Sequence, residues 1–368
     1  MYGIKDRMPL TRKRVLARHS APVTRAAWTH DGRYAMTCGH DKVLRLWNPS
    51  RPEVNPDSGA AKLWAGDPSG RVELALHIKE YAGAHGHEVT GVAIARDNAS
   101  FASCGGDRAV FLWDVTTGQV RRKLEGHTSR VNAVCFGGDD AVLVSGSYDQ
   151  SVRLWDLRSR SRDPIQTLAG DAKDSVSCVA ATGHEVVAGC VDGCVRVYDL
   201  RAGLVHTDRL GGRPVTGLSV SRDGRCLLAS LLGQGLGRRG GVALLVEKAT
   251  GQALNAYHGH VHGAYGLEAS FAHATDAHVV SASEDGFPCV YDLVSADLVQ
   301  RLVTAPPQTA LTEPGAASPG PLHRTGSRLG SGGRSGGPAV VGVACHPSEA
   351  KLLASCLDGT AVLWEGGF

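Results

Sequence analysis

The sequence contains no long apolar run, few aromatic residues and almost no net charge. No stretch approaches the ~18 consecutive apolar residues of a membrane-spanning helix, and the first residues lack the apolar segment of a secretory signal. Lys and Arg total 39 against 36 Asp and Glu, so the net charge is only +3. A general nucleic-acid binder would carry a strong basic excess. We therefore expect a soluble protein without membrane contact and without direct sequence-specific contact to nucleic acid.

The ten cysteines lack the spacing of a metal or redox site, because no Cys-x-x-Cys pair is present. Most of them stand in strand-like apolar runs such as AVCF and LLASC, where cysteine acts as a small hydrophobic residue. We predict reduced structural thiols and no metal or other cofactor. Reduced thiols place the protein in the cytoplasm and nucleus.

An internal repeat organises the chain. An Asp is followed six residues later by Trp or Tyr, with apolar residues between them, as in DKVLRLWN, DRAVFLWD, DQSVRLWD, DGCVRVYD, DGFPCVYD and DGTAVLWE. A weaker copy, GGVALLVEKATG, has Val246 at the aromatic position. The seven anchor positions are 47, 113, 155, 198, 246, 291 and 364, and four of the six spacings lie between 42 and 48 residues. That period is typical of one propeller blade.

The two longer spacings, 66 and 73 residues, each contain an insertion with the composition of a loop. We predict an inter-blade insertion at 49–80, a short insertion at 233–241, and a disordered Pro-, Gly-, Ser- and Arg-rich insertion at 304–338.

Each repeat alternates apolar and polar residues with a period of two, and Asp-Gly or polar turns separate the runs, which is typical of antiparallel strands. Three strands precede each aromatic anchor and a fourth follows it. The predicted fold is all-β: one seven-bladed β-propeller over 13–368. The segment RKRVLAR near the N-terminus would supply the outer strand of the last blade, which closes the ring and removes an exposed edge.

These signatures resemble the WD-repeat family. The resemblance implies a structural tetrad in which Asp holds a His ring, a Ser or Thr hydroxyl extends the chain, and the indole N–H of Trp donates to that hydroxyl. The predicted tetrads are His19, Thr37, Asp41, Trp47; His87, Ser103, Asp107, Trp113; His127, Ser145, Asp149, Trp155; and a Tyr version, His260, Ser281, Asp285, Tyr291. Repeats four, five and seven depart, because Ala188 and Ala354 replace the hydroxyl and the fifth lacks the Asp.

Five other patterns suggest chemistry but are better explained without it. Ser, His and Asp of one tetrad have the composition of a hydrolase triad, yet the set recurs, and no G-x-S-x-G motif is present. The G-x-G-x-x-G run at 235–240 precedes a strand, so the helix N-terminus that phosphate binding requires is missing. The HGHVH run at 258–262 could form a metal-binding face, but its central His is assigned to a tetrad. Arg324, Arg328 and Arg334 could contact RNA and Ser318 precedes Pro, although a solvated linker is the simpler interpretation. We therefore predict that the protein is not an enzyme.

Longer runs resemble one subfamily, the mitogen-activated protein kinase organizers. They include TCGHDKVLRLWNP, GGDRAVFLWDVTTGQVRRKLEGH and SGSYDQSVRLWDLRSRSRDPIQTL. This resemblance implies a monomeric, non-enzymatic scaffold within larger complexes, associated with pre-mRNA splicing complexes and with mitogen-activated protein kinase modules. It also places partner contacts on the face near the tetrad Asp, at His40, Glu88, Arg130, Asn132, Tyr148 and Glu284.

An alternative function is that of a substrate receptor in a cullin-type ubiquitin ligase. Such receptors carry W/Y-D-x-R boxes in consecutive blades, and this sequence contains WDLR ending at Arg158 and YDLR ending at Arg201. The simpler interpretation is that each Arg places a charge at the edge of a blade. The partner would then be a ligase adaptor.

Overall fold

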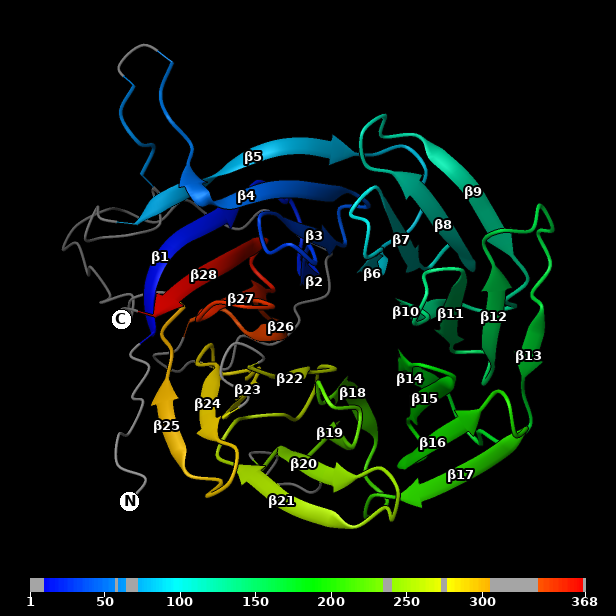
Figure 1. Ribbon diagram of the computed structural model, residues 1–368. Coiled ribbons are helices and arrows are strands. Elements are labelled where there is room, and N and C mark those ends of the chain that lie inside the picture. The colour runs from blue at the N-terminus through cyan, green and yellow to red at the C-terminus, as the bar shows by residue number, and fades with distance from the viewer. Residues whose placement is uncertain are drawn as a thin grey trace, which may run out of the picture.

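The computed structural model describes residues 10–56, 59–63, 72–233, 240–272, 277–304 and 337–366. All regular secondary structure in these ranges is β-strand, which confirms the predicted all-β class. The sheets stand around a central axis and form a ring, the arrangement of a β-propeller (Figure 1).

Five sheets contain four strands each, in the order in which the strands occur in the chain. They are β6 (Val89–Ile94), β7 (Ser100–Gly105), β8 (Ala109–Asp114) and β9 (Val120–Glu125); β10 (Val131–Phe136), β11 (Val142–Ser147), β12 (Val152–Asp156) and β13 (Gln166–Leu168); β14 (Val176–Thr182), β15 (Glu185–Cys190), β16 (Cys194–Asp199) and β17 (Leu204–Arg209); β18 (Val215–Val220), β19 (Cys226–Leu231), β20 (Val242–Glu247) and β21 (Ala253–His258); and β22 (Ala269–Phe271), β23 (His278–Ser281), β24 (Cys289–Asp292) and β25 (Leu298–Arg301).

The remaining eight strands form one sheet in which the two ends of the chain meet. Its strands are β1 (Leu10–Ala17), β2 (Val23–Trp28), β3 (Ala35–Gly39), β4 (Leu44–Pro52), β5 (Glu73–Tyr81), β26 (Val340–Cys345), β27 (Lys351–Cys356) and β28 (Thr360–Gly366). Strand β1 pairs antiparallel with β28 along its whole length. It also pairs in parallel with the start of β5, and so joins strands β2–β5 to strands β26–β28. The N-terminal strand therefore covers the edge of the last repeat, as the sequence predicts.

The turn after each repeat Asp explains why Asp-Gly recurs in the sequence. The residue that follows the Asp has a positive φ, which favours glycine because glycine has no Cβ. Three repeats place glycine there, Gly193, Gly286 and Gly359 (φ 82°, 82° and 89°), and three place a longer residue, Lys42, Arg108 and Gln150 (φ 67°, 60° and 64°). The carboxylate accepts a backbone hydrogen bond two residues on, as from Cys194 to Asp192 at 3.0 Å, and so stabilises the turn.

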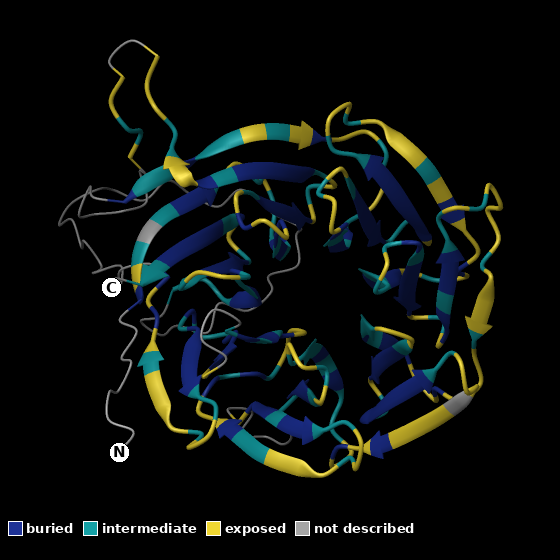
Figure 2. Ribbon diagram, in the orientation of Figure 1, coloured by how far each residue is buried: buried dark blue, intermediate teal, exposed yellow. Residues whose placement is uncertain are grey.

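Burial follows the position of a strand in its sheet (Figure 2). The two middle strands are almost entirely buried, as in β7 and β8, whereas the outer strand β9 exposes most of its side chains. The indoles of Trp47, Trp113, Trp155 and Trp364 are among the largest fully buried side chains and pack between neighbouring sheets.

All ten cysteines are unpaired. Burial raises the pKa of the Cys178 thiol to about 12, so this residue is a packing element and not a nucleophile at neutral pH.

An ion pair connects two strands on either side of the last repeat. Arg25 of β2 pairs with Glu268, which directly precedes β22. Gly342 of β26 lies beneath the pair, and a Cβ at this position would stand 3.2 Å from the Glu268 carboxylate. Burial raises the pKa of Glu268, and the charge of Arg25 opposes that rise. The pair links the first and sixth repeats across the seventh, where the ring closes.

The predicted insertions match the structure in part. Strands β4 and β5 extend to Pro52 and from Glu73, so the boundaries 49–80 are too wide at both ends. The described part of this excursion is hydrogen-bonded, with bridges from Val54 to Ala61 and from Leu63 to Glu73. The interior of the range 233–241 and residues 305–336 lie outside the described residues.

The first residue of the last predicted insertion is part of the packed structure. Thr304 is 1% exposed, and its hydroxyl donates to the carbonyl of Gly286 at 2.8 Å. It therefore belongs to the packed structure that follows β25.

Candidate functional site

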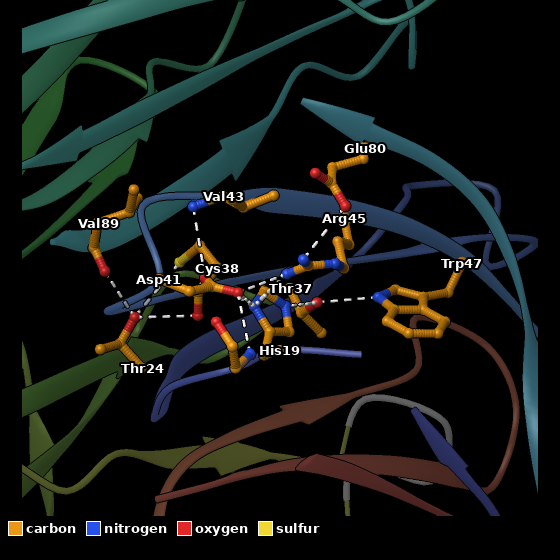
Figure 3. A network of polar contacts seen from close by, with 11 residues as sticks. His19, Thr24, Thr37, Cys38, Asp41, Val43, Arg45, Trp47, Glu80 and Val89 are labelled. Carbon is orange, nitrogen blue, oxygen red and sulfur yellow. Dashed lines mark hydrogen bonds and ion pairs between the residues drawn. The ribbon is translucent and has the colours of Figure 1, made fainter. Parts of the chain in front are cut away.

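The first repeat, whose strands β2–β5 belong to the eight-stranded sheet, contains a complete tetrad (Figure 3). The indole Nε1–H of Trp47 donates to Thr37 Oγ1 at 2.9 Å, and Thr37 Oγ1 lies 2.7 Å from His19 Nε2. His19 Nδ1 lies 2.9 Å from Asp41 Oδ1. The four side chains come from the turn after β1 and from β3, β4 and the turn between them, so this network ties the strands together at one end of the sheet.

Arg45 of β4 extends this first tetrad. Its guanidinium lies 2.7 Å from the Asp41 carboxylate and 3.2 Å from that of Glu80. Burial opposes ionisation of Asp41, but hydrogen bonds from His19 and Arg45 outweigh it and hold the pKa of the carboxyl well below its usual range. The Asp is therefore a permanent anion between two donors.

The second tetrad uses His85, and the prediction of His87 is wrong. His85 Nδ1 lies 2.6 Å from Asp107 Oδ2, and its Nε2 lies 2.7 Å from Ser103 Oγ. Trp113 donates to the same hydroxyl at 2.8 Å. The His87 side chain is 67% exposed and only approaches the outer side of Asp107, at 3.3 Å. The packed position thus belongs to the imidazole two residues earlier.

The third tetrad has all its predicted members in contact. Trp155 donates to Ser145 at 2.8 Å, Ser145 Oγ lies 2.8 Å from His127 Nε2, and His127 Nδ1 lies 2.9 Å from Asp149. The carboxylate also accepts from the Ser151 hydroxyl at 2.5 Å.

The structure does not assemble the tetrad predicted around His260. His260 Nδ1 contacts the hydroxyl of Tyr291 directly, at 3.2 Å. Ser281 donates instead to the carbonyl of Ala282. Asp285 accepts from Ser283 and from the backbone of Phe287. The phenol reaches further than an indole N–H, so it bonds to the ring without the intervening hydroxyl.

The geometry of the tetrads does not suit hydrolysis. A catalytic hydroxyl must reach a substrate, but Thr37, Ser103 and Ser145 are each 0% exposed and accept the N–H of an indole. The three networks are therefore structural braces. Within the described residues no group of three metal-ligating side chains is present, and the HGHVH run places His260 and His262 in the interior, with His258 exposed.

Three of the predicted partner residues lie together. The Arg130 guanidinium carbon stands 5.8 Å from the centre of the Tyr148 ring, and Arg130 Nε donates to Asn132 at 3.0 Å. Tyr148 is 56% exposed and Arg130 is exposed. The Asn132 amide, in contrast, donates to the Val176 carbonyl of the next sheet at 2.7 Å. Arg130 and Tyr148 thus form an accessible pair, and Asn132 supports it from below.

The hydrogen bond from the Asn132 side chain to the next sheet has equivalents around the ring, which we call the seam. The sequence does not make these bonds evident. The second residue of several inner strands donates from its side chain to the first inner-strand residue of the next sheet. These bonds are Thr24 to Val89, Thr90 to Val131, Asn132 to Val176, and Ser177 to Val215. A register shift at each of these positions leaves the side chain free to reach across.

The other partner candidates occupy separate turns. His40 is exposed, and its backbone N–H donates to the carbonyl of Pro22. Glu88 is half-buried, and its carbonyl accepts from Gly106. The Glu284 carboxylate accepts three successive backbone N–H groups, from Gly263 to Tyr265, at 2.6–2.9 Å. Glu284 therefore shapes a loop.

Arg158 and Arg201 lie in the turns after β12 and β16. Both are exposed, and the Arg158 side chain is 75% exposed with a 3.3 Å contact to Asp139. In each box the Asp two residues earlier accepts the Arg backbone N–H, at 2.8 and 2.9 Å. The loop residues Ser318, Arg324, Arg328 and Arg334, and most of the run at 235–240, lie outside the described residues. In the described chain no helix is long and apolar enough to cross a membrane.

Comparison with known proteins agrees with this geometry. The model of the WD domain, G-beta repeat family matches residues 10–48, 78–114, 118–156, 162–199 and 327–365. The human WD repeat domain-containing protein 83 is 41% identical over 358 residues, which cover 97% of this chain and 93% of the relative. The rat protein of that name is 41% identical over 272 residues, 74% of this chain and 76% of the relative. An uncharacterized WD repeat-containing protein of Schizosaccharomyces pombe is 31% identical over 94% of both chains.

WD-repeat proteins are generally scaffolds for protein–protein interaction, and the names of these relatives carry no enzymatic activity. The braced ring, with its recurring turns and buried hydroxyls, is a scaffold of this kind. The chain therefore belongs to the WD-repeat proteins, in the family of WD repeat domain-containing protein 83.

Proposed function

We propose that this protein is a seven-bladed propeller that holds protein components of pre-mRNA splicing complexes together, and that it also serves mitogen-activated protein kinase modules. The blade count treats the eight-stranded sheet as two blades, β2–β5 and β26–β28 with β1, joined at the β1–β5 contact. The two named complexes rest on the resemblance to the kinase-organizer subfamily. We place splicing first because splicing machinery is the broader need of a eukaryotic cell, and we expect the protein in both cytoplasm and nucleus.

The observation that carries this proposal is the exposed pair of Arg130 and Tyr148. Arg and Tyr are enriched among the residues that dominate binding energy at protein interfaces. The Arg–Tyr contact holds both side chains in one arrangement, which lowers the entropy lost on binding. The candidates His40 and Glu88 stand in separate turns. Glu88 together with Arg130 makes the set mixed in charge, which suits a protein surface better than a phosphate backbone.

The test is affinity purification followed by mass spectrometry, with the Arg130→Glu, Tyr148→Ala double variant beside the wild type. We expect the wild type to recover spliceosomal proteins, with kinases of the cascade as a second group. The double variant should lose them while its melting temperature stays unchanged, because both side chains are exposed. Retention of all these partners by the double variant would contradict the proposed surface.

A second candidate function, a receptor for a ligase adaptor, is favoured by the shared geometry of the two W/Y-D-x-R boxes. Both arginines are accessible, and the same Asp-capped turn presents each of them. The Arg158→Ala, Arg201→Ala double variant should then lose the adaptor and keep every other partner. On the scaffold function that we prefer, this variant keeps its spliceosomal and kinase partners.

A further inference from the structure

The fourth repeat (β14–β17) keeps the Asp of the tetrad but none of its partners. Asp192 stands at the Asp position, whereas Ala188 replaces the hydroxyl and Tyr198 the indole. A cavity of about 420 Å³ opens beside Asp192, between the β15–β16 turn and the outer strand β17.

A backbone contact identifies the residue that replaces the tetrad His. In the complete tetrads the residue after the His donates its backbone N–H to the tetrad Asp, as Ser20 does to Asp41 and Thr128 to Asp149. In the fourth repeat Lys173 makes this contact with Asp192 at 3.1 Å. The preceding residue is Ala172, so the fourth repeat has a methyl group where the others have an imidazole.

The first repeat shows what the same arrangement looks like when it is filled (Figure 3). Arg45 lies four residues after Asp41, as Arg196 lies four residues after Asp192, and each Arg is 2.7 Å from its Asp. Arg45 has a second carboxylate, Glu80, at 3.2 Å on the paired outer strand.

In the fourth repeat the residue that pairs with Arg196 on the outer strand is Thr207. Arg196 is only 3% exposed. Both of its terminal nitrogens donate to Asp192, at 2.7 and 3.3 Å, whereas Arg45 divides its terminal nitrogens between Asp41 and Glu80. A guanidinium carries five N–H groups, so Arg196 keeps donors beyond the two that Asp192 engages, and these can contact a further anion.

Two more cations line the same cavity. Lys173 and Arg209 are exposed, and within the described ranges no side-chain hydrogen bond or ion pair engages the Lys173 ammonium or the Arg209 guanidinium. The carboxylates of the cavity are those of Asp171 at the rim and Asp192, and Asp192 is already paired with Arg196. The three cations exceed the two carboxylates by one charge, in a hollow that is open to solvent.

We propose that this cavity binds one anionic side chain, a carboxylate or a phosphate monoester, from an acidic segment of a partner protein. The anion would take the place that Glu80 has in the first repeat and would contact Arg196, with Lys173 and Arg209 at the rim. A protein segment is the occupant because the family consists of protein-interaction scaffolds. This site is separate from the Arg130–Tyr148 pair and does not depend on which complexes that pair serves.

The sharpest test converts the fourth repeat into the first. Thr207→Glu places a carboxylate opposite Arg196, and Thr207→Gln is its uncharged control; Thr207 is exposed on an outer strand, so both variants should fold. The probes are fluorescein-labelled Gly-Ser peptides with one central phosphoserine, glutamate or serine, titrated at low salt and followed by fluorescence anisotropy. The phosphoserine and glutamate arms distinguish the two anions.

We expect an anionic peptide to bind the wild type at least about tenfold more tightly than the serine peptide, which corresponds to about 1.4 kcal/mol. Thr207→Glu should abolish this preference and Thr207→Gln should keep it. The Lys173→Ala, Arg209→Ala variant should weaken binding, whereas Arg121→Ala with Lys123→Ala, an equal loss of charge on β9, should not. A wild type without preference for either anionic peptide, or a Thr207→Glu variant that binds them undiminished, overturns the proposal. The Arg130→Glu, Tyr148→Ala variant should bind these peptides normally, which separates this site from the proposed function.

Discussion

Removal of the Asp149 carboxylate should be among the most damaging single changes at the tetrads. Asp149→Ala removes the acceptor of the His127 ring N–H and of the Ser151 hydroxyl, and both side chains are buried. It leaves these two groups only a long contact with each other, at 3.4 Å. Two backbone N–H groups also donate to this carboxylate. That of Thr128 belongs to an exposed residue and can bond to water, and that of Ser151 lies 3.1 Å from Asp149. An unsatisfied buried donor costs about 1–3 kcal/mol, so the two buried side-chain donors alone give a loss of about 2–6 kcal/mol.

The matched variant is Asp358→Ala in the last repeat. Asp358 is exposed, and within the described part of the chain its side chain accepts from the backbone and hydroxyl of Thr360 in its own turn and from no other residue. Loss of these exposed bonds should cost about 0.5–1.5 kcal/mol. Urea denaturation at pH 7, followed by circular dichroism, compares the two midpoints. Equal destabilisation would refute the argument that cost depends on the buried donors left unpaired.

Three further predictions concern the second and sixth repeats and the long insertion. His85→Ala should lower the melting temperature strongly, whereas His87→Ala should change the free energy of unfolding by no more than about 0.5 kcal/mol, since its side chain is exposed; equal melts would restore His87 to the tetrad. Burial is the main reason that the pKa of His260 and of His262 is lowered, in both cases to about 4. In the unfolded chain these imidazoles take up protons below pH ~6.5, whereas in the folded protein they stay neutral until about pH 4. Their contribution to the free energy of unfolding is therefore fully present above pH ~6.5 and is lost as the pH falls toward 4. His262→Gln should therefore flatten the fall of the urea midpoint between pH 7 and 4.5, and an unchanged slope would contradict the assignment. Replacement of residues 305–336 by a short Gly-Ser linker should leave the melting temperature nearly unchanged, and a large drop would show that the segment docks on the ring.

Most of the fold could be predicted from the sequence because the same strand pattern recurs in every repeat. Each Asp-x-x-x-x-x-Trp run marks a turn and the strand after it, and the structure places β4, β8, β12, β16, β24 and β28 at these runs. The insertion boundaries were less accurate. ELALHIKEY alternates weakly, and β5 gains its partners only when β4 and β1 are present on either side, which local periodicity does not report.

The tetrads could be predicted as far as their spacing is constant. In the first and third tetrads the hydroxyl residue follows the His by 18 positions and the Asp follows the His by 22. The same two intervals select His85 over His87. His260 stands 25 residues before Asp285. That longer interval was the signal that the two side chains would not meet.

The seam residues and the cavity of the fourth repeat depend on contacts between strands, so no local sequence motif predicts them. Thr24, Thr90, Asn132 and Ser177 share a position but no residue type, and only the register shift reveals what they have in common. The cavity likewise follows from three separate losses: the His at Ala172, the hydroxyl at Ala188 and the second carboxylate at Thr207. Each loss alone resembles ordinary drift in a repeat. Cross-strand pairing brings Ala188 and Thr207 to Arg196, and the turn after Ala172 meets Asp192 through the backbone of Lys173. The three changes therefore converge on one intact Asp–Arg pair, which is why we propose the ligand site in this repeat.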